Sequence, residues 1–228
     1  MSVTGTGSKL DLGSNPIKVG WMSLGTLDIE SGGEVKSAGA YIGYNSHANN
    51  AVAVSNGTWN NTGSLRVGGG DPSEYAGSGT LTIFDGGTVN TGETVLGGLA
   101  DSFGTVVVSG VNSTLDVGTQ SIYVGKRGQG TLGIYNQGSL RSGTAYIGYE
   151  WPANNVVTVD NATWNSSGAV CVGGGGGAGT GALTIQNGGT LQCADVYVGY
   201  LGTGEMTVQG GGTVLAAGAV LAWAPGAR

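Results

Sequence analysis

The chain repeats itself in steps of about 25 residues, a period typical of stacked supersecondary units. The phrase GTLDIESGGEV begins at Gly25, GTLTIFDGGTV at Gly79, GTLGIYNQGSL at Gly130 and GALTIQNGGTL at Gly181. Each phrase is followed by a second strand-like segment, in turn AYIGY, TVLGG, AYIGY and VYVGY. Such units bury their apolar faces against neighbouring copies, so the sequence predicts a solenoid in place of a globule with one central core.

Apolar residues alternate with small or polar ones in each step, which is typical of a half-buried strand. In the step that begins at Gly79, Leu81 and Ile83 are expected to point inward, and the following Gly86-Gly87 pair suits a tight corner. We predict an all-β fold: a right-handed parallel β-helix, or β-solenoid, of about nine coils with three short strands per coil. After one degenerate coil, the coils begin at Gly25, Asn50, Gly79, Gly104, Gly130, Asn155, Gly181 and Gly204.

Coils also alternate in kind. The coils that begin at Asn50 and Asn155 carry Trp59 and Trp164 at an inward position, so the larger unit is a pair of coils of about 50 residues. We expect a degenerate N-terminal coil over 1–24, solenoid repeats over 25–222 and a C-terminal end or truncation over 223–228. Residues before Gly25 read as a worn coil and not as a cap, whereas Trp223 and Pro225 offer a partial stop at the other end. If its ends are uncapped, this segment is expected to self-associate end to end.

Composition excludes several classes of function. Glycine accounts for 49 of the 228 residues, charged residues make up 10%, and the formal net charge is −6. Lysine and arginine are dispersed, so the basic stripe of a nucleic-acid-binding protein is missing. No apolar run approaches the ~18 residues of a membrane helix, so we expect no membrane insertion by this segment. Residues 1–20 lack the apolar stretch of a secretory signal, which favours an excised segment of a longer protein.

The two-coil unit resembles the repeat associated with autotransporter (type V secretion) passengers and PEP-CTERM surface proteins. The motifs that carry the resemblance are GTLTI-x-x-GGTV, YIGY and SN-x-TWN-x-(T/S)G-x-L-x-VGG, and they cover residues 25–222. The resemblance implies an exported bacterial protein at the cell surface or outside the cell. It further implies a structural stalk or adhesive passenger without chemistry of its own, whose partner is a glycan or another cell-surface ligand.

Seven tyrosines are candidate ligand-binding residues. They flank the inward residue of the third strand or follow the glycine at the next corner, and together they form an aromatic stripe along one face. Such rings suit stacking on a sugar or peptide, but they equally suit ladder stacking within the protein. The sequence leaves both interpretations open for Tyr41, Tyr44, Tyr123, Tyr146, Tyr149, Tyr197 and Tyr200.

Two alternative functions remain open from the sequence. A carbohydrate-active β-helix enzyme, a lyase or glycosidase, would need paired carboxylates. The long turns after the third strand collect the charged groups Asp71, Glu74, Asp101, Lys126, Arg127 and Glu150. Because turns attract charge for solvation alone, we expect no catalytic residues. An ice-binding solenoid needs a flat two-column threonine array, of which strand one supplies a complete row only at Thr80 and Thr82.

No metal or cofactor is expected. His47 is the only histidine and lies in a turn, without the partners of a zinc site. Alternation predicts that Cys171 points outward and that Cys193 points inward or toward a corner. Two cysteines with opposed directions on different strands are expected to be free thiols.

Overall fold

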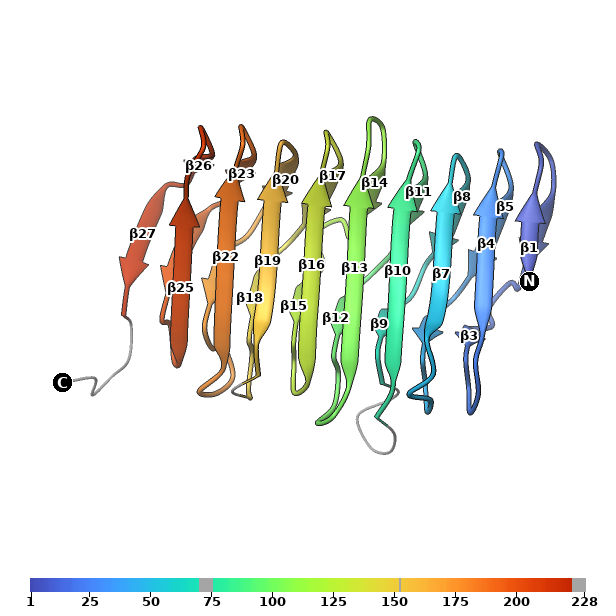
Figure 1. Cartoon of the computed structure of the whole chain (residues 1–228), viewed down its shortest axis with the longest axis horizontal. Helices are drawn as coiled ribbons and strands as arrows, with labels where there is room; N and C mark the ends of the chain where they lie inside the picture. Colours follow the sequence, from blue (N-terminus) through green and yellow to red (C-terminus); the bar gives the residue numbers. More distant parts are fainter. Residues whose placement is uncertain (70–75, 152, 223–228) are drawn as a thin grey trace.

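The computed structural model describes residues 1–69, 76–151 and 153–222. Asp71, Glu74 and the expected C-terminal end over 223–228 lie outside the described residues. The described chain is a parallel β-solenoid of three nine-stranded sheets, so the predicted fold class is confirmed. In Figure 1 the front strands run upward, the strands behind run downward and the coils advance to the left, which is a right-handed helix.

The first sheet is the broad face at the front of Figure 1 and contains the longest strands. The leading residues of the coils pair with one another in parallel, so Asn50 aligns with Gly79 and Gly79 with Gly104. This register is the one that the repeat predicts. Its strands are β1 (Ser2–Thr4), β4 (Thr26–Glu30), β7 (Asn50–Ser55), β10 (Ser78–Phe84), β13 (Phe103–Ser109), β16 (Gln129–Tyr135), β19 (Asn155–Asp160), β22 (Thr180–Gln186) and β25 (Thr203–Val208).

The second sheet follows the Gly- and Asn-rich corner. Positive φ at this corner falls on residues such as Asn56 (46°) and Gly86 (81°), where a left-handed conformation turns the chain between sheets. Its strands are β2 (Lys9–Asp11), β5 (Glu34–Ser37), β8 (Thr58–Asn61), β11 (Thr88–Asn90), β14 (Thr114–Asp116), β17 (Ser139–Ser142), β20 (Thr163–Ser166), β23 (Thr190–Gln192) and β26 (Thr213–Leu215).

The third sheet closes the coil and leads into the long turn. Residues 1–24, expected as a degenerate coil, contribute one strand to each sheet, and those strands pair with β4, β5 and β6. The strands of the third sheet are β3 (Ile17–Val19), β6 (Ala40–Ile42), β9 (Leu65–Val67), β12 (Thr94–Leu96), β15 (Ile122–Val124), β18 (Ala145–Ile147), β21 (Val170–Val172), β24 (Asp195–Val198) and β27 (Gly218–Leu221).

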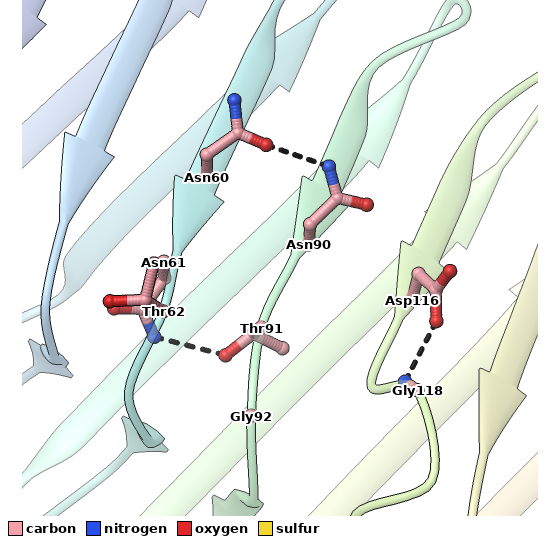
Figure 2. A pocket seen from close by; sticks show the side chains of 8 residues that line it. All are labelled: Asn60, Asn61, Thr62, Asn90, Thr91, Gly92, Asp116 and Gly118. Atoms are coloured by element: carbon pink, nitrogen blue, oxygen red, sulfur yellow. Dashed lines mark hydrogen bonds between the residues drawn. The ribbon is translucent and has the colours of Figure 1, made fainter.

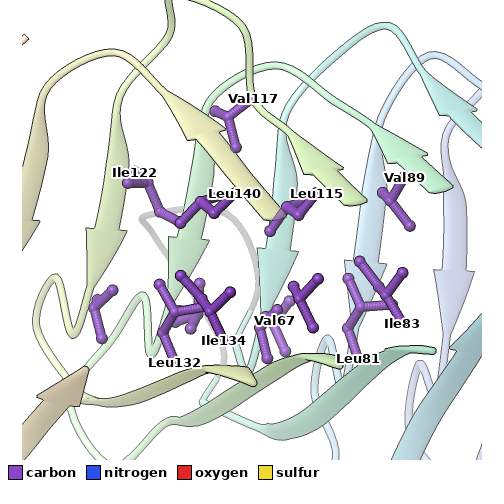
Figure 3. Packing of buried hydrophobic residues seen from close by; sticks show 14 of the residues in the cluster. Val67, Leu81, Ile83, Val89, Leu115, Val117, Ile122, Leu132, Ile134 and Leu140 are labelled. Carbon is purple, nitrogen blue, oxygen red and sulfur yellow. The ribbon is translucent and has the colours of Figure 1, made fainter. Parts of the chain in front are cut away.

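The core is a continuous stack of aliphatic side chains between the three sheets. Figure 3 shows the side chains of Leu81 and Ile83, from the first sheet, across the interior from those of Val89 and Leu115, from the second sheet. These four side chains are fully buried, as the alternation predicts. Equivalent positions of successive coils therefore build one continuous core, and no coil is complete without its neighbours.

The variant coils bury polar groups as well. The indole Nε1 of Trp164 donates a hydrogen bond to Ser142 Oγ of the preceding coil at 3.0 Å, and Trp59 does the same to Ser37 Oγ at 3.1 Å. Asn155 Oδ1 accepts from the Gly130 amide at 2.8 Å, and its Nδ2 donates to the carbonyl oxygens of Ala153 and Thr180. These bonds pair buried polar groups that would otherwise destabilise the fold.

The last described coil leaves apolar surface in solvent. Val208, Leu215 and Leu221 are 48%, 53% and 76% exposed. Met206 and Val214 help to line an apolar pocket of about 490 Å³ at this end. The expected end-to-end self-association stays a prediction. Among the described residues, no helix has the length and apolarity to cross a membrane.

Candidate functional site

The third sheet aligns the candidate tyrosines because parallel register stacks equivalent outward positions. Tyr123 of β15 pairs in register with Tyr146 of β18. Their rings are stacked, with centroids 5.1 Å apart and planes 15° apart. Tyr149 follows the corner glycine and meets both rings edge-on, at centroid distances of 5.0 and 4.9 Å. The three rings form a compact cluster with the stacked and T-shaped geometries that aromatic pairs prefer.

A second cluster lies near the N-terminal end of the same face. Tyr41 and Tyr44 meet edge-on at 5.3 Å, and Trp21 lies 5.3 Å from Tyr44. Lys18, whose Cα aligns with that of Tyr41, holds its Nζ 3.6 Å from the centroid of the Trp21 ring. The sequence analysis did not single out Lys18 and Trp21. The repeat pattern could have identified them, because both residues belong to the degenerate first coil and stand one repeat before Tyr41 and Tyr44.

Among the described residues, the seven candidate tyrosines fall into three clusters, of which Tyr197 and Tyr200, with ring centroids 5.3 Å apart, make the third. Arg66 and Val95 occupy the column between the first two clusters. All seven tyrosines are half-buried, so they offer less open ring surface than a fully exposed stripe would. These are the contacts that the ladder interpretation requires, and ligand binding by the stripe stays a prediction.

Two glycines of the five-glycine run from Gly173 are explained by one of these clusters. A Cβ at Gly175 would come within 2.5 Å of Tyr146 and 2.7 Å of Tyr149, and a Cβ at Gly176 within 2.6 Å of Tyr149. The backbone of this long turn therefore lies directly against the rings. Only glycine permits so close an approach, and the approach covers part of the Tyr149 ring.

The two cysteines are free thiols, as predicted. Cys171 lies in the outward column, as predicted, and is aligned with Tyr146 and Tyr197. Its side chain is nevertheless only 4% exposed, because large neighbours in that column cover it. Cys193 is 8% exposed. Burial raises the pKa of each thiol from 9.0 to about 11, and the charge of Asp195 contributes at Cys193.

We expect both thiols to react slowly in the folded protein. A pKa that rises from 9.0 to about 11 reduces the thiolate fraction at neutral pH about a hundredfold, and the thiolate is the nucleophile. Labelling with an aromatic disulfide reagent at neutral pH should modify neither thiol rapidly, whereas denaturant without reductant should expose both. Because the folded state holds these protons more tightly, the thiols should also lower the unfolding free energy as pH rises from about 9 toward 11. Rapid labelling of the native protein would contradict the buried positions.

The charged long turns form one ion pair in the described structure. Arg127 Nε donates to Glu150 Oε2 at 2.7 Å on the surface. Asp101 and Arg127 line a shallow pocket of about 360 Å³ together with Trp151. His47 is exposed in its turn. Within the described residues, no group of three histidine, cysteine or acidic side chains has the spacing of a metal site.

The second sheet carries a regular polar surface that the sequence analysis missed. The six rows from β8 to β23 place a hydroxyl residue two positions before a second polar residue, with a core residue between them, as in Thr88-Val89-Asn90. In β2 and β5 both places hold charged residues, and β26 ends on Leu215. The parallel register turns the rows into two columns. The hydroxyl column contains Thr58, Thr88, Thr114, Ser139, Thr163, Thr190 and Thr213, and the amide column contains Asn60, Asn90, Asp116, Arg141, Asn165 and Gln192.

Fold and surfaces together define the protein as a β-solenoid repeat protein whose ordered features all follow the coil period. The chain is similar to the uncharacterized lipoprotein YdeK of Escherichia coli (strain K12), with 33% identity over 132 residues. The similarity covers 55% of this chain but only 10% of that protein's length. No protein-family model and no solved structure matches the chain.

Proposed function

We propose that the chain is a stalk segment of an exported bacterial surface protein, similar in kind to an autotransporter passenger. The observation that carries the proposal is the uninterrupted register of three parallel sheets through nine strands each. A rod in which each coil is hydrogen-bonded to the next along its whole length resists bending and sets a fixed reach. Its function in this proposal is to hold other parts of a protein, or its own surface, away from the cell.

A location at the cell envelope is supported by the similarity to YdeK, which is named as a lipoprotein. A lipoprotein is anchored by its lipid, which suits a rod that projects from a membrane surface. The tyrosine clusters suit the same role. Cross-strand aromatic pairs contribute roughly 0.2–1 kcal/mol each, so the clusters stiffen the third sheet where the long turns vary.

Deletion of residues 130–180 tests the stalk function. The deletion removes two coils and joins Gln129 to Gly181, which is equivalent to Gly130 in the repeat. It also removes Ser142 and Trp164 together, so no buried donor is left without its acceptor. We expect a folded rod that is shorter by about 10 Å, from two coils of ~4.8 Å each. Electron microscopy or small-angle X-ray scattering measures the length.

The control is a change in a long turn that leaves the coil count unchanged. Glu150→Gln removes the charge of the described ion pair at the surface. A stalk should keep its length and its surface display in this variant, whereas an enzyme with a long-turn carboxylate should lose activity. If the deletion variant unfolds or keeps the parent length, the coils are not the interchangeable units that a stalk requires.

A further inference from the structure

The polar face of the second sheet has two shallow pockets in one line along the rod. The first is about 450 Å³ and spans β8, β11 and β14, with Asn60, Asn90 and Asp116 along one side (Figure 2). The second is about 360 Å³ and spans β17, β20 and β23, with Asn165 and Gln192 in equivalent places. Six consecutive coils are thus hollowed at the same corner, over about 24 Å at ~4.8 Å per coil.

The walls of these pockets are held in place by buried polar side chains. Asn61 donates to the Gly63 carbonyl oxygen and to Thr91 Oγ1, both at 3.0 Å (Figure 2). In the second pocket, Ser166 Oγ donates to the Gly143 carbonyl oxygen at 2.6 Å. Because these side chains are already ordered, binding a partner costs little further conformational entropy on this surface.

The charge of the face selects against ionic ligands. Within the six rows that line the pockets, Asp116 and Arg141 are the charged members of the amide column, and their Oδ2 and Nη1 atoms lie 3.7 Å apart across adjacent coils, where the charges offset each other. Beyond Asn60 the column continues with Lys36 and Asp11, outside the pockets. The remaining members of the column in the six rows are amides. Such a face provides hydrogen bonds without a net field, which suits a ligand rich in hydroxyl groups and without charge.

Part of this hydrogen-bonding capacity is unused by the protein. Asn90 donates to Asn60 Oδ1 at 2.8 Å, so these two amides are partly paired. Within the part of the chain that the structure describes, the exposed side-chain amides of Asn165 and Gln192 form no hydrogen bond with protein groups. They lie in register on neighbouring strands, so a ligand meets two free amides one coil apart.

We propose that this face binds an extended, uncharged polysaccharide that lies along the rod axis. The aligned pockets favour a long, thin occupant, and most of the residues that line them have polar side chains. Each of these six coils offers one hydroxyl group and one second polar group, so the same contacts recur along a polymer with its own repeat. The inference goes beyond the stalk function, which stands whether or not the face binds a glycan.

Native gel electrophoresis through gels that contain a soluble polysaccharide tests the inference. The probes are mixed-linkage β-glucan, xylan, glucomannan and dextran, with polygalacturonate as the anionic comparison. We expect at least one neutral polymer to retard the chain and polygalacturonate to have no effect. The double variant Asn165→Ala/Gln192→Ala should raise the dissociation constant at least fivefold. The matched control is Thr80→Ala/Thr82→Ala, which changes outward half-buried residues of the first sheet.

Three results would overturn the inference. The first is that none of the neutral polymers retards the chain, and the second is that the two double variants bind equally well while both keep the parent circular dichroism and melting temperature. The third is thermal hysteresis of the parent that disappears in the Asn165/Gln192 variant. That outcome would assign the hydroxyl and amide columns to ice, the alternative that the threonines of strand one first suggested.

Discussion

Trp164→Ala is expected to lower the free energy of unfolding by about 3–5 kcal/mol, the range for truncation of a fully buried aromatic residue. The Trp164 side chain has no exposed surface and fills the inward position between Leu140 and Leu191 of the adjoining coils. Its removal leaves a cavity that the neighbouring coils are too rigidly paired to fill. It also leaves the Ser142 hydroxyl without its indole donor. Both effects act in an interior coil, with two further coils between it and the C-terminal end of the described rod.

The conservative variant separates the two effects. Trp164→Phe keeps most of the ring volume but loses the indole Nε1, so it should cost about 1–3 kcal/mol for the unsatisfied buried group and the smaller ring. Denaturant unfolding, followed by both circular dichroism and tryptophan fluorescence, measures the differences. Coincidence of the two probes tests whether the rod unfolds as one unit. A loss below about 1 kcal/mol for Trp164→Ala would show that the core relaxes around the site.

Gly148→Ala is expected to destabilise the protein by at least about 3 kcal/mol, well above the typical surface substitution. Gly148 has a φ of 75°, which a side chain adopts only with strain. A Cβ at this position would also collide with the Thr180 carbonyl oxygen, a backbone atom of a neighbouring coil. The coils would have to separate locally to accept the methyl group, and the parallel hydrogen bonds at that corner would be lost.

Gly188→Ala is the matched control. Gly188 has a φ of 78°, almost the same as that of Gly148, but a Cβ there would meet no atom within 4 Å. It should therefore show the backbone strain alone, about 1 kcal/mol. Thermal and denaturant unfolding of both variants gives the difference. Equal losses would mean that φ strain alone explains why glycine occupies the corner after the third strand.

Much of the fold follows from local rules that act on one coil at a time. Alternation places Leu81 and Ile83 in the core, and the repeated corner glycines mark the bends. Because each coil repeats this pattern, the parallel register could be predicted from the coil repeat. The burial of Cys171 could not, because it depends on how far the rings of neighbouring coils extend across the outward column. The contact of Gly175 and Gly176 with Tyr149 depends on the path of a long turn, which has no periodic pattern.

The polar columns of the second sheet are a different case. Their signal is present in the repeat, since the rows read TWN, TVN, TLD, SLR, TWN and TLQ from Thr58 to Gln192. The outward threonines of the first strand are more evident in the sequence, because that strand is the longest and most regular of the three. A search for outward columns on each of the three faces would have found the second sheet, whereas the pockets beside it depend on side-chain positions that only the structure provides.

The asparagines that open the variant coils impose an order on how such a rod can grow. Asn155 occupies the space above Gly125, where a Cβ would collide with its Oδ1, and it accepts the amide hydrogen of Gly130. Asn50 stands in the same relation to Gly20 and Gly25. An asparagine coil therefore needs a bare glycine at the corner of the coil before it. Gene duplications that copy an asparagine coil together with its preceding coil preserve this contact, whereas glycine coils, which follow one another at Gly79, Gly104 and Gly130, can be added singly.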